Sequence, residues 1–235
     1  MFRILFACFS LALFASSARA AALLTENFDD VTNLAGAGWV QTNNSDPLGQ
    51  TDWFQGNAGI FSAQSGASDS YIAANFLNAD FSGDISNWLI LPEMTLNNGD
   101  TLTFYTRTEA GSLFPDRLEV RFSGMGASTD VGSTASSVGD FTLLLDTINP
   151  ALDVGGYPED WMLVTVILSG LSGPTDGRLA LRYFVLDTDN NGNYIGIDTL
   201  TVTASEVPLP AGGMLLLSGL AGLGVIRRKN RTNVA

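Results

Sequence analysis

The chain of 235 residues contains no histidine, one cysteine and one lysine. The absence of histidine excludes Ser–His–Asp triads, histidine zinc sites and acid–base chemistry by imidazole. The single cysteine, Cys8, lies in an apolar run at the amino terminus, so the rest of the chain can form no disulfide. The single lysine, Lys229, lies near the carboxyl terminus, and residues 21–206 carry no lysine at all.

Basic residues are also scarce in the central part of the chain. Residues 21–206 hold five arginines and all 24 Asp and Glu residues, a formal charge of −19. A body with this charge repels phosphate backbones and anionic lipids, which counts against nucleic acid and against membrane surfaces as partners. The same charge is compatible with cation binding and with solubility outside the cell.

The amino terminus has the composition of a secretory signal peptide. Residues 1–3 form a short basic region, residues 4–15 are largely apolar, and Ala18-Arg19-Ala20 offers a small-x-small cleavage site. The sequence therefore predicts a signal peptide over residues 1–20 and an exported mature protein.

The tail, residues 207–231, has three parts in a fixed order. Its two prolines, Pro208 and Pro210, favour an extended backbone at the start. The uncharged run 211–226 would rise about 24 Å as a helix, short of a hydrocarbon core of about 30 Å. The basic end is a membrane stop consisting of Arg227, Arg228, Lys229 and Arg231. The alternative is an ordinary membrane anchor, although such an anchor has no use for the proline motif.

This tail resembles a bacterial PEP-CTERM sorting signal in its VPLPA variant. The matching motif is Val207, Pro208, Leu209, Pro210 and Ala211. The resemblance implies a single transient membrane span, recognition by an exosortase in the inner membrane, and final localisation at the cell surface or in the extracellular matrix.

The body, residues 23–205, is typical of one all-β domain. Apolar residues alternate with charged or hydroxyl residues, which predicts an inward set of Leu102, Phe104, Leu118, Val120, Phe122, Leu181 and Tyr183. Arg117, Glu119 and Arg121 are expected on a solvent-facing side. Residues 161–168 are apolar at both parities, which predicts a central strand, and residues 123–139 read as a long surface loop.

About ten short strands separated by turns predict a two-sheet antiparallel sandwich of jelly-roll type. The expected strands are residues 23–28, 39–42, 53–55, 71–76, 88–91, 101–105, 117–122, 141–146, 161–168, 178–185 and 194–203.

An ordered set of motifs in the body resembles the choice-of-anchor J family of exported bacterial domains. The motifs are Asn27-Phe28-Asp29-Asp30, Asn87-Trp88-Leu89-Ile90-Leu91-Pro92, Pro115-Asp116-Arg117-Leu118-Glu119, Gly177-Arg178-Leu179-Ala180-Leu181 and Tyr194-Ile195-Gly196-Ile197-Asp198. That family is similar to cleaved-adhesin and MAM-type sandwiches. The resemblance implies a non-catalytic surface domain with a structural or adhesive role, and it names no ligand.

One stretch has the spacing of a calcium loop, D-x-D-x-N-G-x5-D. Oxygen ligands at alternating positions and a glycine at the turn are what a hard cation needs. The residues are Asp187, Asp189, Asn191, Gly192 and Asp198. The alternative is an ordinary Asp/Asn/Gly turn between two strands.

Asp198 also lies where the inward parity of its strand changes. Ile195 and Ile197 share one parity, Leu200 and Val202 the other, which predicts a β-bulge near Asp198. We expect one structural calcium between this last strand and the first, with Glu26 or Asp29 as the partner of Asp198. The alternative is that Asp198 only caps backbone amides at the bulge.

Two further functions can be compared with the adhesive one. A glycosidase needs converging carboxylates, but Asp116 and Glu119 differ in parity and should point to opposite faces. A carbohydrate-binding module for extracellular polysaccharide could use Trp53, Tyr71 and Trp161 as stacking surfaces, if these side chains are exposed and coplanar. The sequence therefore predicts a non-catalytic protein of the bacterial envelope or matrix, structural or adhesive, with sugar binding as the alternative.

Overall fold

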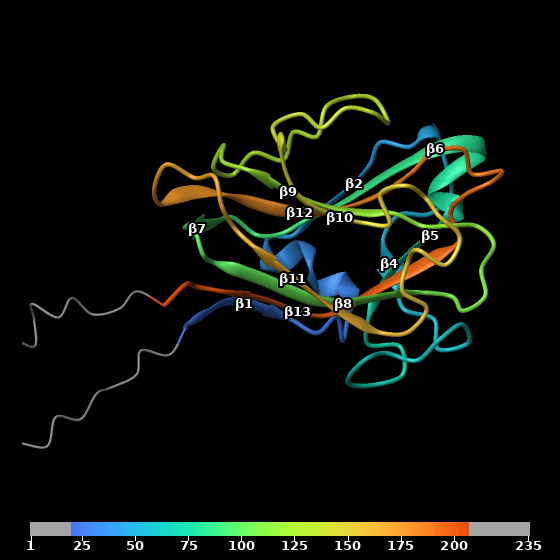
Figure 1. Ribbon diagram of the computed structural model, residues 1–235, viewed down its shortest axis with the longest axis horizontal. Helices are drawn as coiled ribbons and strands as arrows, with labels where there is room; N and C mark the ends of the chain where they lie inside the picture. Colours follow the sequence, from blue (N-terminus) through green and yellow to red (C-terminus); the bar gives the residue numbers. More distant parts are fainter. Residues whose placement is uncertain (1–19, 207–235) are drawn as a thin grey trace, which may run out of the picture. The chain divides into compact units, whose positions relative to one another are not determined.

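The structure is a computed structural model that describes residues 20–206, and the strands of its folded unit, Ala21–Ser205, form two antiparallel sheets packed face to face (Figure 1). The predicted all-β, two-sheet antiparallel sandwich is therefore confirmed. The expected signal peptide, apart from Ala20, and the expected sorting segment at 207–231 lie outside the described residues. Within residues 20–206, no helix has the length and apolar character needed to cross a membrane.

The first sheet has six strands in the order β11-β8-β13-β5-β4, with β1 beside β13. β13 pairs with β8 along one edge, whereas its other edge is shared by β5 and β1, so this strand organises the sheet. The strands are β1 Ala22–Glu26, β4 Phe54–Gln55, β5 Ile72–Asn75, β8 Thr101–Thr108, β11 Met162–Ile167 and β13 Tyr194–Thr203.

The second sheet has seven strands in the order β10-β9-β12-β6-β2, with β3 beside β6 and β7 beside β12. The strands are β2 Val40–Asn43, β3 Asp46–Leu48, β6 Ala79–Ile90, β7 Met94–Leu96, β9 Leu118–Ser123, β10 Leu143–Ile148 and β12 Thr175–Val185. Three short 3-10 helices complete the described elements: η1 Val31–Asn33, η2 Ala35–Ala37 and η3 Phe76–Asn78.

The main hydrophobic core lies between the sheets, and it contains the whole inward set expected from the alternation. All seven side chains are buried: Leu102, Phe104, Leu118, Val120, Phe122, Leu181 and Tyr183. This part of the prediction is confirmed, because alternating apolar residues can be buried only if they share one face of a strand. Since both sheets and this core lie within Ala21–Ser205, the unit contains what a domain needs to fold by itself.

Each sheet also carries a smaller cluster on its outer face. On the seven-stranded sheet, the segment between β9 and β10 packs Val131 and Phe141 against Trp88. The expected solvent-facing side of β9 is therefore wrong in part: Glu119 is buried, and Arg117 and Arg121 are partly covered. The reason is that residues 124–142 fold back over this face instead of extending into solvent.

Strand order was harder to predict than strand parity. The expected central strand at 161–168 is β11, an edge strand that pairs only with β8. Its second apolar face is exposed, with Leu163 51% and Ile167 63% accessible, whereas Val164 and Val166 are buried. The expected strand at 88–91 is the end of the much longer β6, and the short strands β3 and β7 were not predicted.

Candidate functional site

The predicted bulge in β13 is present at Asp198. The pairing between β13 and β8 shifts between Asp198 and Thr201, and Thr199 has a positive φ of 49°. This extra residue lets Ile197, before the bulge, and Leu200, after it, both point into the core. The parity change in the sequence therefore corresponds to a real change of backbone geometry.

The buried Asp198 carboxylate accepts hydrogen bonds from three backbone amides. Its Oδ2 accepts from the N–H groups of Gln64, at 2.8 Å, and Ser65, at 3.0 Å, and its Oδ1 accepts from Thr199 at 2.6 Å. Burial raises the pKa of Asp198, although the three amides act in the opposite direction. The side chain therefore caps the bulge and fixes the segment between β4 and β5 to β13.

The two first-strand acids occupy different positions. Glu26 Oε1 accepts from the backbone N–H of Phe28 at 2.8 Å, so it caps its own turn. Asp29 lies beside Gly66, where an added Cβ would be 3.3 Å from Asp29 Oδ1. Asp29 and Asp198 thus border the same short segment, 64–66, from two sides.

The Asp/Asn turn after β12 is closed by its own hydrogen bonds. Asp187 Oδ1 accepts from the N–H of Asp189 at 3.2 Å, and Asn191 Nδ2 donates to the carbonyl of Leu186 at 2.8 Å. Asp198 lies four residues inside β13, about 13 Å along the strand from its start. Nowhere in residues 20–206 do three His, Cys, Asp or Glu side chains gather as a possible metal site. The turn residues Asp187, Asp189 and Asn191 therefore lie apart from Asp198, whereas a calcium ion between Asp198 and Glu26 or Asp29 stays a prediction.

The aromatic residues considered for sugar stacking are packed against other groups. Trp53 belongs to the core between the sheets, and Tyr71 is fully buried. Trp161 is half-buried, donates from Nε1 to the carbonyl of Ser62 at 2.9 Å, and meets Tyr71 at an interplanar angle of 78°. The exposed, coplanar Trp or Tyr surface that sugar binding was expected to require is absent from these three residues.

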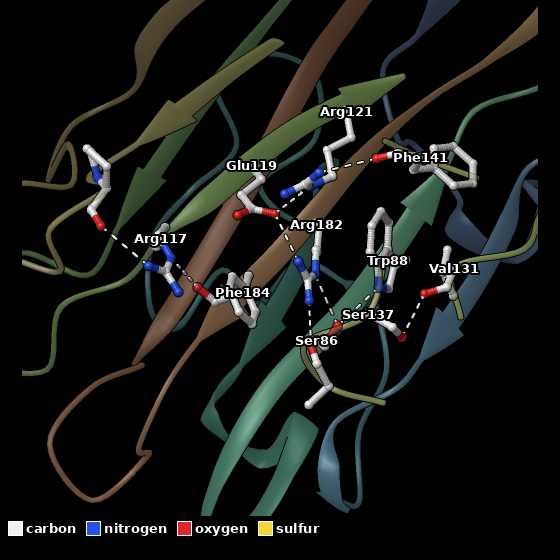
Figure 2. A network of polar contacts seen from close by, with 12 residues as sticks. Ser86, Trp88, Arg117, Glu119, Arg121, Val131, Ser137, Phe141, Arg182 and Phe184 are labelled. Atoms are coloured by element: carbon white, nitrogen blue, oxygen red, sulfur yellow. Dashed lines mark hydrogen bonds and ion pairs between the residues drawn. The ribbon is translucent and has the colours of Figure 1, made fainter. Parts of the chain in front are cut away.

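A buried ion network lies on the outer face of the seven-stranded sheet (Figure 2). Arg182 donates to Glu119 Oε2 at 3.1 Å, to Ser86 Oγ and to the carbonyl of Ala135, and its guanidinium lies over the Trp88 ring. Arg121 donates to the same Glu119 oxygen at 2.7 Å. The network therefore ties β6, β9 and β12 to the covering segment 124–142.

Burial and pairing act in opposite directions on these charges. Burial alone would raise the pKa of Glu119, but the hydrogen bond from Arg121 and the charge of Arg182 outweigh it and lower that pKa. Burial lowers the pKa of Arg182 to about 10, against the opposing effect of Glu119. This network was not predicted from the sequence. The apolar residues of the Gly- and Ser-rich segment indicate that it folds back over the sheet: Val131, Val138 and Phe141.

A third buried carboxylate, Asp116, bonds to the core residue Tyr183. Its Oδ1 accepts from the Tyr183 hydroxyl at 2.5 Å and from the N–H of Asn193 at 2.8 Å, and its Oδ2 accepts from Thr108 Oγ1 at 2.5 Å. Burial raises the pKa of this carboxyl, against the three hydrogen bonds. Asp116 points inward, whereas Glu119 points to the outer face, so the two carboxylates do not converge.

A hollow of about 260 Å³ opens at the surface beside Asn193, whose backbone N–H donates to Asp116. Its lining residues come from η3 and from the loops 109–117 and 186–193: Phe76, Phe114, Thr188, Gly192 and Asn193. Phe76 and Phe114 are 46% and 47% exposed. The hollow was not predicted from the sequence, since its lining residues are far apart in the chain. The apolar Leu113-Phe114 pair in a loop was the one feature that pointed to an exposed apolar surface here.

Solved structures similar to this chain include cleaved adhesin domains. The K1 domain of Lys-gingipain from Porphyromonas gingivalis has a TM-score of 0.54 and 23% identity, over 78% of this chain and 98% of that domain. The K3 domain of the same protein has a TM-score of 0.51 and 21% identity, over 80% and 100%. No family model and no curated protein sequence matches the chain. The likeness establishes a shared sandwich fold.

The ion network predicts a pH-dependent stability. Glu119→Gln should lower the free energy of unfolding by about 3 kcal/mol near neutral pH, because it leaves two arginines without their buried counter-charge. A lowered folded-state pKa stabilises the fold above the unfolded value of 4.5, and this stabilisation is lost as the pH falls through the folded-state pKa. Urea unfolding at several pH values should show the variant and parent converging in acid. Asp146→Asn, at an exposed carboxylate, is the control, and a pH-independent loss would contradict the network.

The calcium prediction stays open to a direct test. If calcium binds only the folded state at Asp198, a concentration of one hundred times Kd adds about 2.7 kcal/mol of stability. Thermal melting of Ala21–Ser205 should then shift upward from EDTA to calcium, and Asp198→Asn should lose this shift. An unchanged midpoint in the parent would leave Asp198 as the cap of the bulge alone.

Proposed function

We propose that this chain is an exported, surface-sorted, non-catalytic adhesive domain of the choice-of-anchor J type, with a jelly-roll sandwich as its body. The fold supports the proposal, because it is shared with cleaved adhesin domains. The buried acids also support it, because Asp116 bonds to the core residue Tyr183 whereas Glu119 bonds to Arg182 on the outer face, so the two carboxylates do not converge.

One observation carries the adhesive role: the ends of the folded unit and its exposed aromatic residues lie at opposite ends of the sandwich. Ala204 N–H donates to the carbonyl of Ala21 at 2.8 Å, so the chain enters and leaves side by side. β13 spans ten residues, about 33 Å, between the loop 186–193 and this end (Figure 1). All three exposed phenylalanines of the described chain surround that far end: Phe76, Phe81 and Phe114.

Exposed aromatic residues in an acidic, soluble sandwich favour a contact surface over an incidental exposure. A domain held through its adjacent ends would present this surface away from the attachment point. The ligand class expected as an alternative from the sequence, an extracellular polysaccharide, would also contact this end, because Trp53, Tyr71 and Trp161 are packed against other groups.

The sorting half of the proposal rests on the order of the tail elements, which lie outside the described residues. A motif at 207–211, a short span at 211–226 and a basic stop are what an exosortase-type enzyme would recognise before transfer to the surface. The intact mass of protein recovered from the cell surface should fit cleavage after about Ala20 and processing near Val207–Ala211. Recovery of a surface peptide that contains Arg227-Arg228 would contradict this.

The adhesive half is tested with beads that carry the Ala21–Ser205 unit, exposed to the extracellular matrix of the producing bacterium. Phe114→Ser should reduce attachment about tenfold or more, since burying one such side chain contributes about 1.5–3 kcal/mol. Leu163→Ser is the matched control, because it removes an equally exposed apolar side chain from β11. Equal attachment by the parent and both variants would show that the contact surface does not lie at this end.

A further inference from the structure

We infer that the hollow between Phe76 and Phe114 binds one apolar side chain of a partner polypeptide whose neighbouring residues are basic. This inference rests on the proposed adhesive function and names the chemistry of the partner. It follows from the size of the hollow, from the way its walls are held, and from the charges at its rim.

The size of the hollow fits one side chain. Its volume of about 260 Å³ is below the roughly 300–1,000 Å³ of most small-molecule sites. Two phenylalanines, Phe76 and Phe114, line it together with Gly192, which has a φ of 84°. A Cβ at Gly192 would lie 3.3 Å from the Tyr183 hydroxyl, so a side chain there would meet a buried group. Such a pocket matches an apolar anchor residue, the element that dominates many protein interfaces.

The walls are held in place before any partner arrives. Gly192 N–H donates to the carbonyl of Pro115 at 2.9 Å, which joins the two loops that form the pocket. Phe76 N–H donates to the carbonyl of Asn193 at 2.9 Å, which adds η3. Asp116 holds the N–H of Asn193 from below. Because hydrogen bonds join these loops, binding requires little further ordering of the chain, which favours affinity.

The rim carries negative charge. Glu109 Oε2 accepts from Asn193 Nδ2 at 3.0 Å, and Asp84 Oδ1 accepts from the N–H of Asp187 at 3.0 Å. Asp187 and Asp189 flank the lining residue Thr188. The ion pairs found within residues 20–206 involve none of these four carboxylates. Lysine or arginine beside an apolar anchor is therefore the complementary chemistry, whereas an anionic polymer would be repelled.

A third phenylalanine extends the apolar surface. Phe81 is 84% exposed and has a φ of 49°, a backbone conformation that is rare for a bulky residue. Its carbonyl accepts from Thr188 Oγ1 at 2.7 Å, which places its backbone beside the pocket lining. The hollow thus has an apolar margin next to its acidic rim. This suits a short peptide that carries both apolar and basic side chains.

The experiment is an array of short peptides probed with the labelled Ala21–Ser205 unit. Peptides with one Leu or Phe between Lys or Arg residues should bind about tenfold or more above matched peptides with Gly at the centre or Glu at the flanks. Raising sodium chloride from about 0.05 to about 0.5 M should weaken this binding, because exposed charges are screened. Phe114→Ser and Asp189→Asn should each reduce it, whereas the controls Leu163→Ser and Asp146→Asn should not.

Three results would overturn the inference. The first is peptide binding without preference for basic flanks, and the second is peptide binding that Phe114→Ser leaves unchanged. The third is binding to neutral oligosaccharides on a parallel glycan array, lost in Phe114→Ser, with no peptide bound. This third result would leave the proposed adhesive function in place, since attachment to matrix would still depend on Phe114. Attachment to matrix that does not depend on Phe114 would place the contact surface elsewhere, and no attachment by the parent would remove the adhesive function itself.

Discussion

The bulge in β13 is the constraint on which the rest of the sandwich depends. β5 pairs with the part of β13 before the bulge and β1 with the part after it, along the same edge. Without the extra residue, Ile197 and Leu200 could not both face the core, because a strand alternates strictly. The Asp198 carboxylate occupies this interruption and supplies acceptors for amides that have no strand partner there. One side chain therefore joins the last strand to the segment between β4 and β5.

The outer face of the second sheet shows a different solution to the burial of polar groups. Arg182 is almost completely buried, which is costly for an isolated charge. The cost is offset because Glu119, Ser86 and the Ala135 carbonyl satisfy its donors, and because its flat guanidinium packs on Trp88. The irregular segment 124–142 gains a fixed position from this arrangement, since it has no strand or helix of its own to hold it.

The alternation of residues predicted the inward faces because it depends only on the local period of a strand. It could not predict that β11 lies at an edge, since apolar residues at both parities look the same whether the second face meets protein or solvent. It also could not predict the cover over Glu119, which depends on where a distant loop returns. The bulge at Asp198 was predictable because parity records it. The Phe76–Phe114 hollow was not, because three segments far apart in the chain build it.

The topology places the two ends of the folded unit far from the loops that carry its exposed phenylalanines. β1 and β13 are antiparallel neighbours, so both ends of the unit Ala21–Ser205 meet at one end of the sandwich, away from the loops at its other end. Those loops rest on Asp116, whose hydrogen bonds connect the core residue Tyr183 to the Asn193 backbone. The side chains at the rim can vary without disturbing this support, because Phe76, Phe81 and Phe114 contribute little to the core. Substitutions at this end of the sandwich can therefore alter its surface while the fold stays the same.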